Sequence, residues 1–252
     1  MLARAPMKPV ESSSAKGKIR SCLAVVSLAL ALPGAFLSFQ KAAAATDTQL
    51  WNEVKLSTQL TDRFDLIASG ALRYSNDISP HDRTSWLFGM NFRATSEFTL
   101  TPSYSYILTD PDDDVKNFEH RFSLVAAMRL PFKLVEATFS TGIEYRLRNE
   151  QSDDWRVRPR LRLKHAVGPD SWNLAAYTAD ELFFDTRDDR WTRNRLFAGI
   201  ERKMRRNWVI DLYYCRQHDF GTDAPDLNII GITIRLSPDA SASAACNDSE
   251  DE

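Results

Sequence analysis

Hydrophobic and polar residues alternate along most of the chain, and the clearest case is WRVRPRLRLKH, residues 155–165. Every second residue of this segment is basic, and the residues between them are apolar; the bases are Arg156, Arg158, Arg160, Arg162 and Lys164, here called the basic ladder. Because successive side chains of a strand point to opposite faces, one face is cationic and the other apolar. Five unpaired cations cannot point into an apolar core. The pattern therefore predicts a strand between lipid and a wet lumen.

The same period of two recurs in eleven segments between residues 50 and 236, joined alternately by short turns and long polar loops. Aromatic residues collect at both ends of the apolar faces, such as Phe64 and Trp208 beside short turns, and Trp86 and Trp155 near long loops. These features are typical of outer-membrane barrels. We therefore expect an all-β, transmembrane, antiparallel up-and-down β-barrel with a polar, charged lumen. A soluble barrel or sandwich with its apolar face inward also alternates and stays open as an alternative.

The odd number of segments conflicts with the even strand numbers of bacterial single-chain barrels. We expect about 12 strands, with 10 as the alternative, or residues 46–50 threading the lumen. Two local irregularities are also expected. Pro159 must leave one ladder hydrogen bond unmade or sit at a bulge, and Asp180-Glu181 interrupts the alternation, which predicts a bulge there.

The two ends of the chain differ from the part between them. Lys16, Lys18 and Arg20 precede an apolar run, and three alanines end at Ala45, which predicts a cleaved secretory signal peptide over residues 1–45. Residues 46–236 are then the barrel. Residues 237–252 contain acids and no base, and are expected to form an acidic flexible tail. Secretion across the inner membrane of a Gram-negative bacterium follows from this organisation.

Several charged residues are expected to face the lumen together with the basic ladder: Glu136, Glu144, Arg146, Glu181, Arg195 and Glu201. Two interpretations stay open. These charges either cross-link one another and fill a small lumen, or they form an anion-attracting pore or a site for a phosphate-bearing ligand. The formal net charge of −2 gives no indication of nucleic-acid binding.

Catalytic chemistry has little support in the sequence. The four histidines are His81, His120, His165 and His218, and none stands at a spacing that suggests a nucleophile, base and acid acting together. No cluster of metal ligands and no phosphate-binding glycine loop is evident. We therefore expect no catalytic residue, no metal and no cofactor.

Two segments carry a resemblance to a known family. Residues 177–184, YTADELFF, and residues 194–200, NRLFAGI, resemble the outer-membrane barrel family catalogued as domain of unknown function 2490, and Trp51-Asn52-Glu53 and residues 158–162 are similar to the same pattern. The resemblance spans roughly residues 50–236. It implies a bacterial outer-membrane location and no established activity, so no catalytic residue is carried over.

The expected protein is a porin-like monomer in outer-membrane lipids, inserted by the barrel-assembly machinery. Its expected role is structural or that of a narrow, charge-lined, anion-favouring channel for a small anionic solute, without nucleic-acid partners. The alternatives are an outer-membrane lipid-modifying enzyme and a soluble periplasmic β-barrel binding module.

Overall fold

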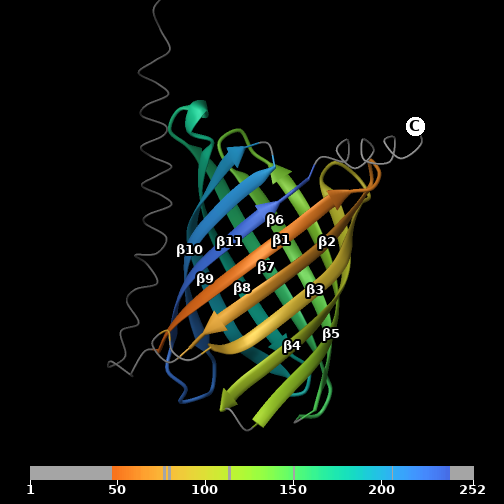
Figure 1. Cartoon of the computed structure of the whole chain (residues 1–252), viewed down its shortest axis with the longest axis vertical. Coiled ribbons are helices and arrows are strands. Elements are labelled where there is room, and N and C mark those ends of the chain that lie inside the picture. Colours follow the sequence, from red (N-terminus) through yellow and green to blue (C-terminus); the bar gives the residue numbers. More distant parts are fainter. Residues whose placement is uncertain are drawn as a thin grey trace, which may run out of the picture. The chain divides into compact units, whose positions relative to one another are not determined.

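The computed structural model describes residues 47–75, 78, 81–112, 115–149, 151–205 and 207–238. In these residues eleven strands form one closed barrel (Figure 1). The strands are β1 (Asp47–Gln59), β2 (Phe64–Tyr74), β3 (His81–Arg93), β4 (Phe98–Asp112), β5 (Val115–Pro131), β6 (Glu136–Arg148), β7 (Asp154–Val167), β8 (Leu174–Asp185), β9 (Arg190–Arg205), β10 (Trp208–Asp219) and β11 (Leu227–Leu236). A single 3₁₀ turn, η1 (Asp170–Trp172), joins β7 to β8. The predicted signal peptide and the predicted tail beyond residue 238 lie outside the described residues.

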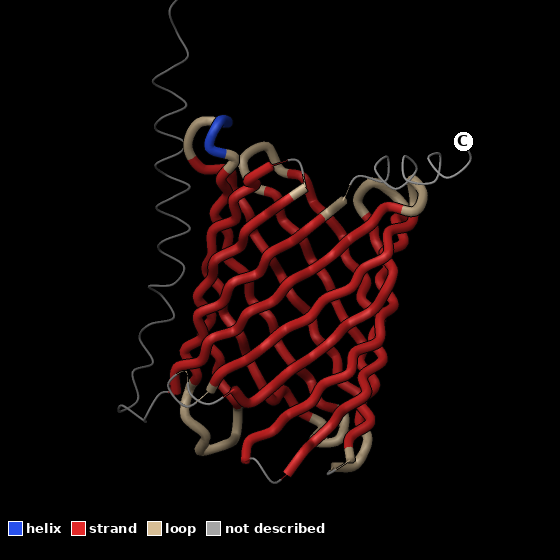
Figure 2. The backbone as a smooth tube through the Cα atoms, in the orientation of Figure 1, coloured by secondary structure: helices blue, strands red, loops and turns tan. Residues whose placement is uncertain are grey.

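Every strand pairs with its neighbours in the sequence, and β1 also pairs with β11, which closes the ring. The strands run obliquely around the barrel (Figure 2). No helix in the part of the chain that the structure describes is long and apolar enough to cross a membrane.

The expected all-β closed barrel is confirmed, and only the strand number and the direction of the closing ladder differ from the sequence prediction. The described barrel has eleven strands and not 12 or 10, and it is antiparallel except for a parallel ladder between β1 and β11. With an odd number of strands in an up-and-down order, the first and last strands run in the same direction, so their ladder must be parallel. Residues 47–50 do not thread the lumen, because they pair with residues 227–230 as the first part of β1.

The alternation predicts the faces of the strands correctly. Large apolar side chains point outward and are exposed; examples are Phe88 (60%), Trp155 (51%), Leu161 (45%) and Ile230 (50%). The intervening positions carry the buried charges of the interior, such as Glu144 (3%) and Glu181 (4%). A soluble barrel that buries its apolar face inside would have the opposite arrangement.

The two expected irregularities take different forms. The ladder between β7 and β8 lacks pairs at Arg158 and Pro159 but keeps its register on both sides, because proline has no N–H to donate. No bulge occurs at Asp180-Glu181, which contradicts the prediction. The register shift lies three residues later, between Phe183 and Phe184, where β8 pairs with β9. Glu181 therefore keeps the phase of β8 and points inward.

Candidate functional site

The candidate site is the barrel interior around the basic ladder of β7. On one side of β7, Glu136 and Glu144 of β6 pair in register with Lys164 and Arg156. On the other side, Glu181 of β8 pairs with Arg160. Because residues paired across neighbouring strands share a face of the sheet, these side chains project together into the lumen.

Glu144 holds two members of the basic ladder at once. Its carboxylate accepts hydrogen bonds from Arg156, at 2.9 Å from Nε and 2.6 Å from Nη2, and from Nη1 of Arg158. Nε of Arg121, on β5, lies 3.7 Å away. The carboxylate is almost fully buried, and it is compensated by several guanidinium groups, as a buried charge requires.

Glu181 continues the network on the other side of β7. It accepts a hydrogen bond of 2.7 Å from Nη2 of Arg158 and lies 3.9 Å from Nη1 of Arg195. Arg195 also donates from Nε to Gln217 Oε1 at 2.8 Å. Arg158 therefore joins Glu144 on β6 to Glu181 on β8.

Two further groups extend the network along the barrel. Glu201 of β9 contacts Nη2 of Arg162 at 2.6 Å, Nζ of Lys164 at 4.0 Å, and Arg235 of β11. Lys164 also lies 3.2 Å from Glu136. Toward the other end of β6, Arg146 forms two hydrogen bonds of 3.0 Å with Glu119.

The structure thus brings together every residue that the sequence analysis placed in the lumen. Four members of the basic ladder form salt bridges with carboxylates, whereas the fifth, Arg160, forms none among the described residues, although it pairs in register with Glu181. Its guanidinium lies 4.7 Å from the centre of the Phe197 ring. Several participants were not among the candidates, including Glu119, Arg121, Gln217 and Arg235. The alternation puts them inside, but only the fold shows which charges they reach.

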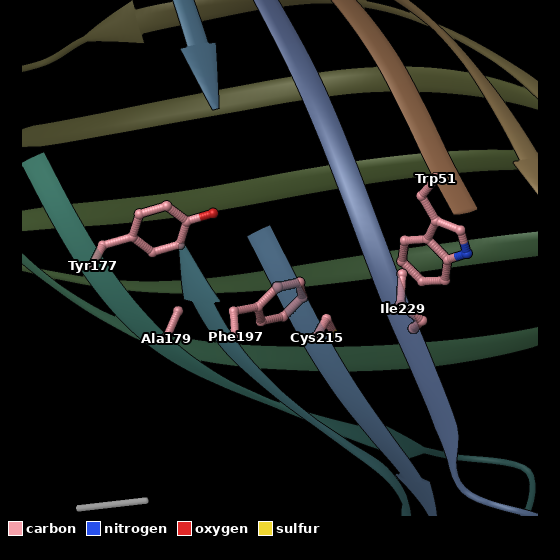
Figure 3. Packing of buried hydrophobic residues seen from close by; sticks show 6 residues of the cluster. All are labelled: Trp51, Tyr177, Ala179, Phe197, Cys215 and Ile229. Atoms are coloured by element: carbon pink, nitrogen blue, oxygen red, sulfur yellow. The ribbon is translucent and has the colours of Figure 1, made fainter. Parts of the chain in front are cut away.

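The interior also holds an apolar cluster, which the expectation of a purely polar lumen did not include. Its buried members are Trp51, Tyr177, Ala179, Phe197, Cys215 and Ile229 (Figure 3). The side chains of Cys215 and Ile229 face the lumen, where an open interior would leave them exposed. Both are 0% exposed, so this part of the lumen is packed.

Arginine side chains make this mixture possible because a guanidinium can lie over an aromatic ring. Arg162 lies 4.0 Å from the centre of the Tyr177 ring, and Arg73 of β2 lies 3.8 Å from that of Trp51. Arg195 lies 4.9 Å from the centre of the Trp51 ring. The aromatic rings therefore separate several of the cations.

One row of inward residues across β5, β4 and β3 consists of small residues. From Arg156, the row of paired inward residues passes through Glu144 to Ser123, Ser103 and Gly89 on β5, β4 and β3. An added Cβ at Gly89 would lie 2.8 Å from Cβ of Ser103. Along this row the lumen is therefore asymmetric, with charged side chains on β7 and β6 and hydroxyls and glycine on β5, β4 and β3.

Other side chains with possible chemistry lie apart from this network. His120 contacts the Tyr104 hydroxyl at 2.7 Å, and His165 lies against the backbone oxygen of Leu134. In the described ranges no group of three or more His, Cys, Asp or Glu residues could hold a metal ion. Asp180 faces outward and accepts a hydrogen bond of 2.5 Å from Asn194.

Two of the seven solved chains that are similar to this one are a porin and a siderophore receptor. One is the "KdgM porin in complex with disordered oligogalacturonate", with 9% identity, a TM-score of 0.43, and an alignment covering 70% of this chain and 92% of that one. The other is the siderophore receptor PirA from Pseudomonas aeruginosa, with 10% identity, a TM-score of 0.29, and coverage of 65% and 34%. No curated protein matches the chain.

Family membership rests on the sequence. The pattern of the family described as "Protein of unknown function (DUF2490)" matches residues 48–228, which include both segments that carry the resemblance. The chain therefore belongs to the DUF2490 family.

Proposed function

We propose that this protein is a monomeric β-barrel of the bacterial outer membrane that forms a narrow, charge-lined channel favouring small anions. The membrane location is supported by the closed ladder and the exposed apolar exterior. In lipid every backbone N–H and C=O must be satisfied within the protein, and a closed barrel achieves this. We expect its insertion to require the barrel-assembly machinery.

The channel is supported by the asymmetry of the lumen. The row Ser123, Ser103 and Gly89 carries short side chains beside the wall of arginines and aromatic rings, and we place the passage along this row. Hydroxyl groups along a passage can replace part of the hydration of a passing ion. A passage along this wall would be narrow, because the side chains opposite are held by salt bridges.

The observation that carries the anion preference is the presence of inward arginines that form no salt bridge among the described residues, because the nearby carboxylates are held by other arginines. Arg160 is the example on the basic ladder, where its Nε is buried without a hydrogen-bond acceptor. Uncompensated positive charge inside low-dielectric walls concentrates anions and repels cations.

Two measurements test this proposal. Cell fractionation should recover the protein with the outer membrane, and unboiled samples should migrate differently from boiled ones on gels. Recovery wholly in the soluble periplasm would reject the membrane location. In planar bilayers, the reversal potential in a KCl gradient should have the sign of a chloride-selective pore.

Two matched pairs of variants test which residue determines the anion selectivity and where the passage lies. Arg160→Gln should reduce chloride selectivity, whereas Arg202→Gln, which removes a charge from the outer face of β9, should not. Ser103→Trp should lower the conductance because the indole ring would occupy the passage beside this row of small residues. Leu100→Trp places the same side chain on the outer face of the same strand and should leave the conductance unchanged. The absence of conductance in the wild type at any voltage would leave a structural barrel and reject the channel.

A further inference from the structure

We infer that this barrel has a binding site for a small, neutral, polyhydroxylated solute of about the size of one sugar ring. The site lies at the end of the barrel where β4 joins β5, around Asn117 and Arg148. The inference goes beyond the proposed channel, because it requires neither conductance nor anion selectivity.

The site is a cavity built on the register of β3 to β6. Arg83 pairs with Thr109, Thr109 pairs with Asn117, and the next inward residue of β5, Glu119, pairs with Arg148 at the end of β6. A cavity of about 210 Å³ lies among these residues. Because pockets for drug-sized ligands have roughly 300–1,000 Å³, this cavity suits a single sugar ring better than a chain of them.

Two atoms of the lining residues have unused hydrogen-bonding capacity. Asn117 Oδ1, an acceptor, and Arg148 Nε, a donor, are buried and have no hydrogen-bond partner among the described residues. A buried polar atom without a partner costs free energy, so a bound group that satisfies it is favoured. A hydroxyl group both donates and accepts. A ligand with several hydroxyl groups therefore matches both atoms.

The charges of the lining are balanced, which disfavours an ionic ligand. Each of its three guanidinium groups has a carboxylate counter-charge: Asp82 for Arg83, Glu119 for Arg146, and Asp154 for Arg148. The closest contacts of the last two pairs are both 3.0 Å. An anion would compete with these carboxylates, and a cation would meet three guanidinium groups. A neutral ligand avoids both costs.

Neutral polar side chains complete the lining. Thr109 and Asn117 contribute a hydroxyl and an amide group, and Asn149 and Gln151 contribute two further amides. Fixed polar groups of this kind orient a small ligand. Asn149 and Gln151 are exposed, so the cavity is open to solvent. Because Thr109 and Asn117 face the lumen and not the lipid, the ligand is a free solute and not a lipid head group.

The test is a binding measurement on the purified, folded barrel in a detergent without a sugar head group, because a glucoside or maltoside would compete for the site. Glucose and galactose are the probes, and saturation-transfer NMR of the probe gives the dissociation constant. Asn117→Leu keeps the size of the side chain but removes its amide, and should weaken binding about fivefold or more. Asn91→Leu makes the same change at an inward position near the other end of β3, and should alter binding less than about twofold.

A second pair of variants tests the cavity itself. Thr109→Trp fills the cavity and should abolish binding, whereas Leu108→Trp places the same side chain on the outer face of β4 and should leave binding unchanged. The different migration of unboiled and boiled samples shows whether each variant is folded. If Thr109→Trp does not fold, the comparison of Asn117→Leu with Asn91→Leu decides.

Charged sugars test the preference for a neutral ligand. Glucuronate and glucosamine keep the sugar ring and add a charge, and both should bind more weakly than glucose. Stronger binding of either charged sugar would overturn the inference, as would binding of glucose that survives in Asn117→Leu and Thr109→Trp. The absence of saturable binding of both neutral probes would leave water as the occupant and would also overturn it. Sugar binding by a barrel that does not conduct would reject the channel and leave this site standing.

Discussion

Glu144 and Glu136 lie on the same strand, and both pair with the basic ladder, yet the structure predicts very different consequences for their loss. Glu144 is 3% exposed and joins Arg156 and Arg158. The Glu136 side chain is 37% exposed, and its partner Lys164 is 30% exposed. We predict that Glu144→Gln strongly destabilises the barrel and that Glu136→Gln hardly does.

The magnitudes follow from burial. Glutamine keeps the shape of glutamate, so Glu144→Gln removes the charge and leaves Arg156 and Arg158 buried with reduced compensation. Removing one partner of a buried ion pair costs about 3–5 kcal/mol. An exposed pair such as Glu136–Lys164 contributes about 0–1 kcal/mol, because water screens it. The difference of at least about 2 kcal/mol corresponds to roughly thirtyfold or more in the unfolding equilibrium.

The assay is equilibrium urea unfolding in lipid vesicles or micelles, followed by the mobility of unboiled samples on gels. Glu144→Gln should lower the free energy of unfolding by at least about 2 kcal/mol more than Glu136→Gln. Equal effects of the two substitutions, or no effect of Glu144→Gln, would refute the claim that the ladder is held by buried carboxylates.

Two further predictions concern the β10–β11 region. An added Cβ at Gly231 would lie 2.0 Å from the Tyr213 ring, whereas nothing lies within 4 Å of one added at Gly70. Gly231→Ala should therefore destabilise the barrel by about 1–3 kcal/mol in the same assay. A control variant Gly70→Ala that is as unstable as Gly231→Ala, or less stable, would contradict this packing argument. Asp226 lies outside the strands. Burial works to raise its pKa, but the hydrogen bonds and charges of His218 and Arg216 together outweigh burial, and the pKa lies below the ordinary 3.8. A lowered carboxyl pKa means that the contact stabilises the loop above the ordinary value and is lost as pH falls through the lowered one. At neutral pH, Asp226→Asn should therefore make the loop at residues 220–226 easier for a protease to cut, and the difference from wild type should vanish in acid; a difference independent of pH would exclude this role.

The faces of the strands could be predicted from the alternation because one side of the barrel is consistently apolar. The inward position of Arg156 to Lys164 and of their partners on β6 follows from that pattern alone. The eleven alternating segments of the sequence correspond in number to the eleven strands, whereas the expectation of an even strand number is not met. This expectation failed because β1 closes on β11 in parallel, and no local pattern in either segment distinguishes that ladder from an antiparallel one.

The balance of charge inside the lumen could not be predicted in the same way. Arg162 reaches Glu201 across β8, and Arg235 reaches the same carboxylate from β11, so pairing depends on side-chain length and barrel curvature. The alternation did not predict the apolar cluster. Strands β8 to β11 carry apolar residues on both faces, so the pattern does not show which of these residues are packed inside.

The central claim is that the barrel encloses a wet passage with uncompensated positive charge. The most direct measurement is the reversal potential of the purified wild-type protein in a planar bilayer under a KCl gradient. The structure predicts a potential of the sign that marks chloride as the more permeant ion. A cation-selective potential, or a barrel that inserts without conducting at any voltage, would contradict the account.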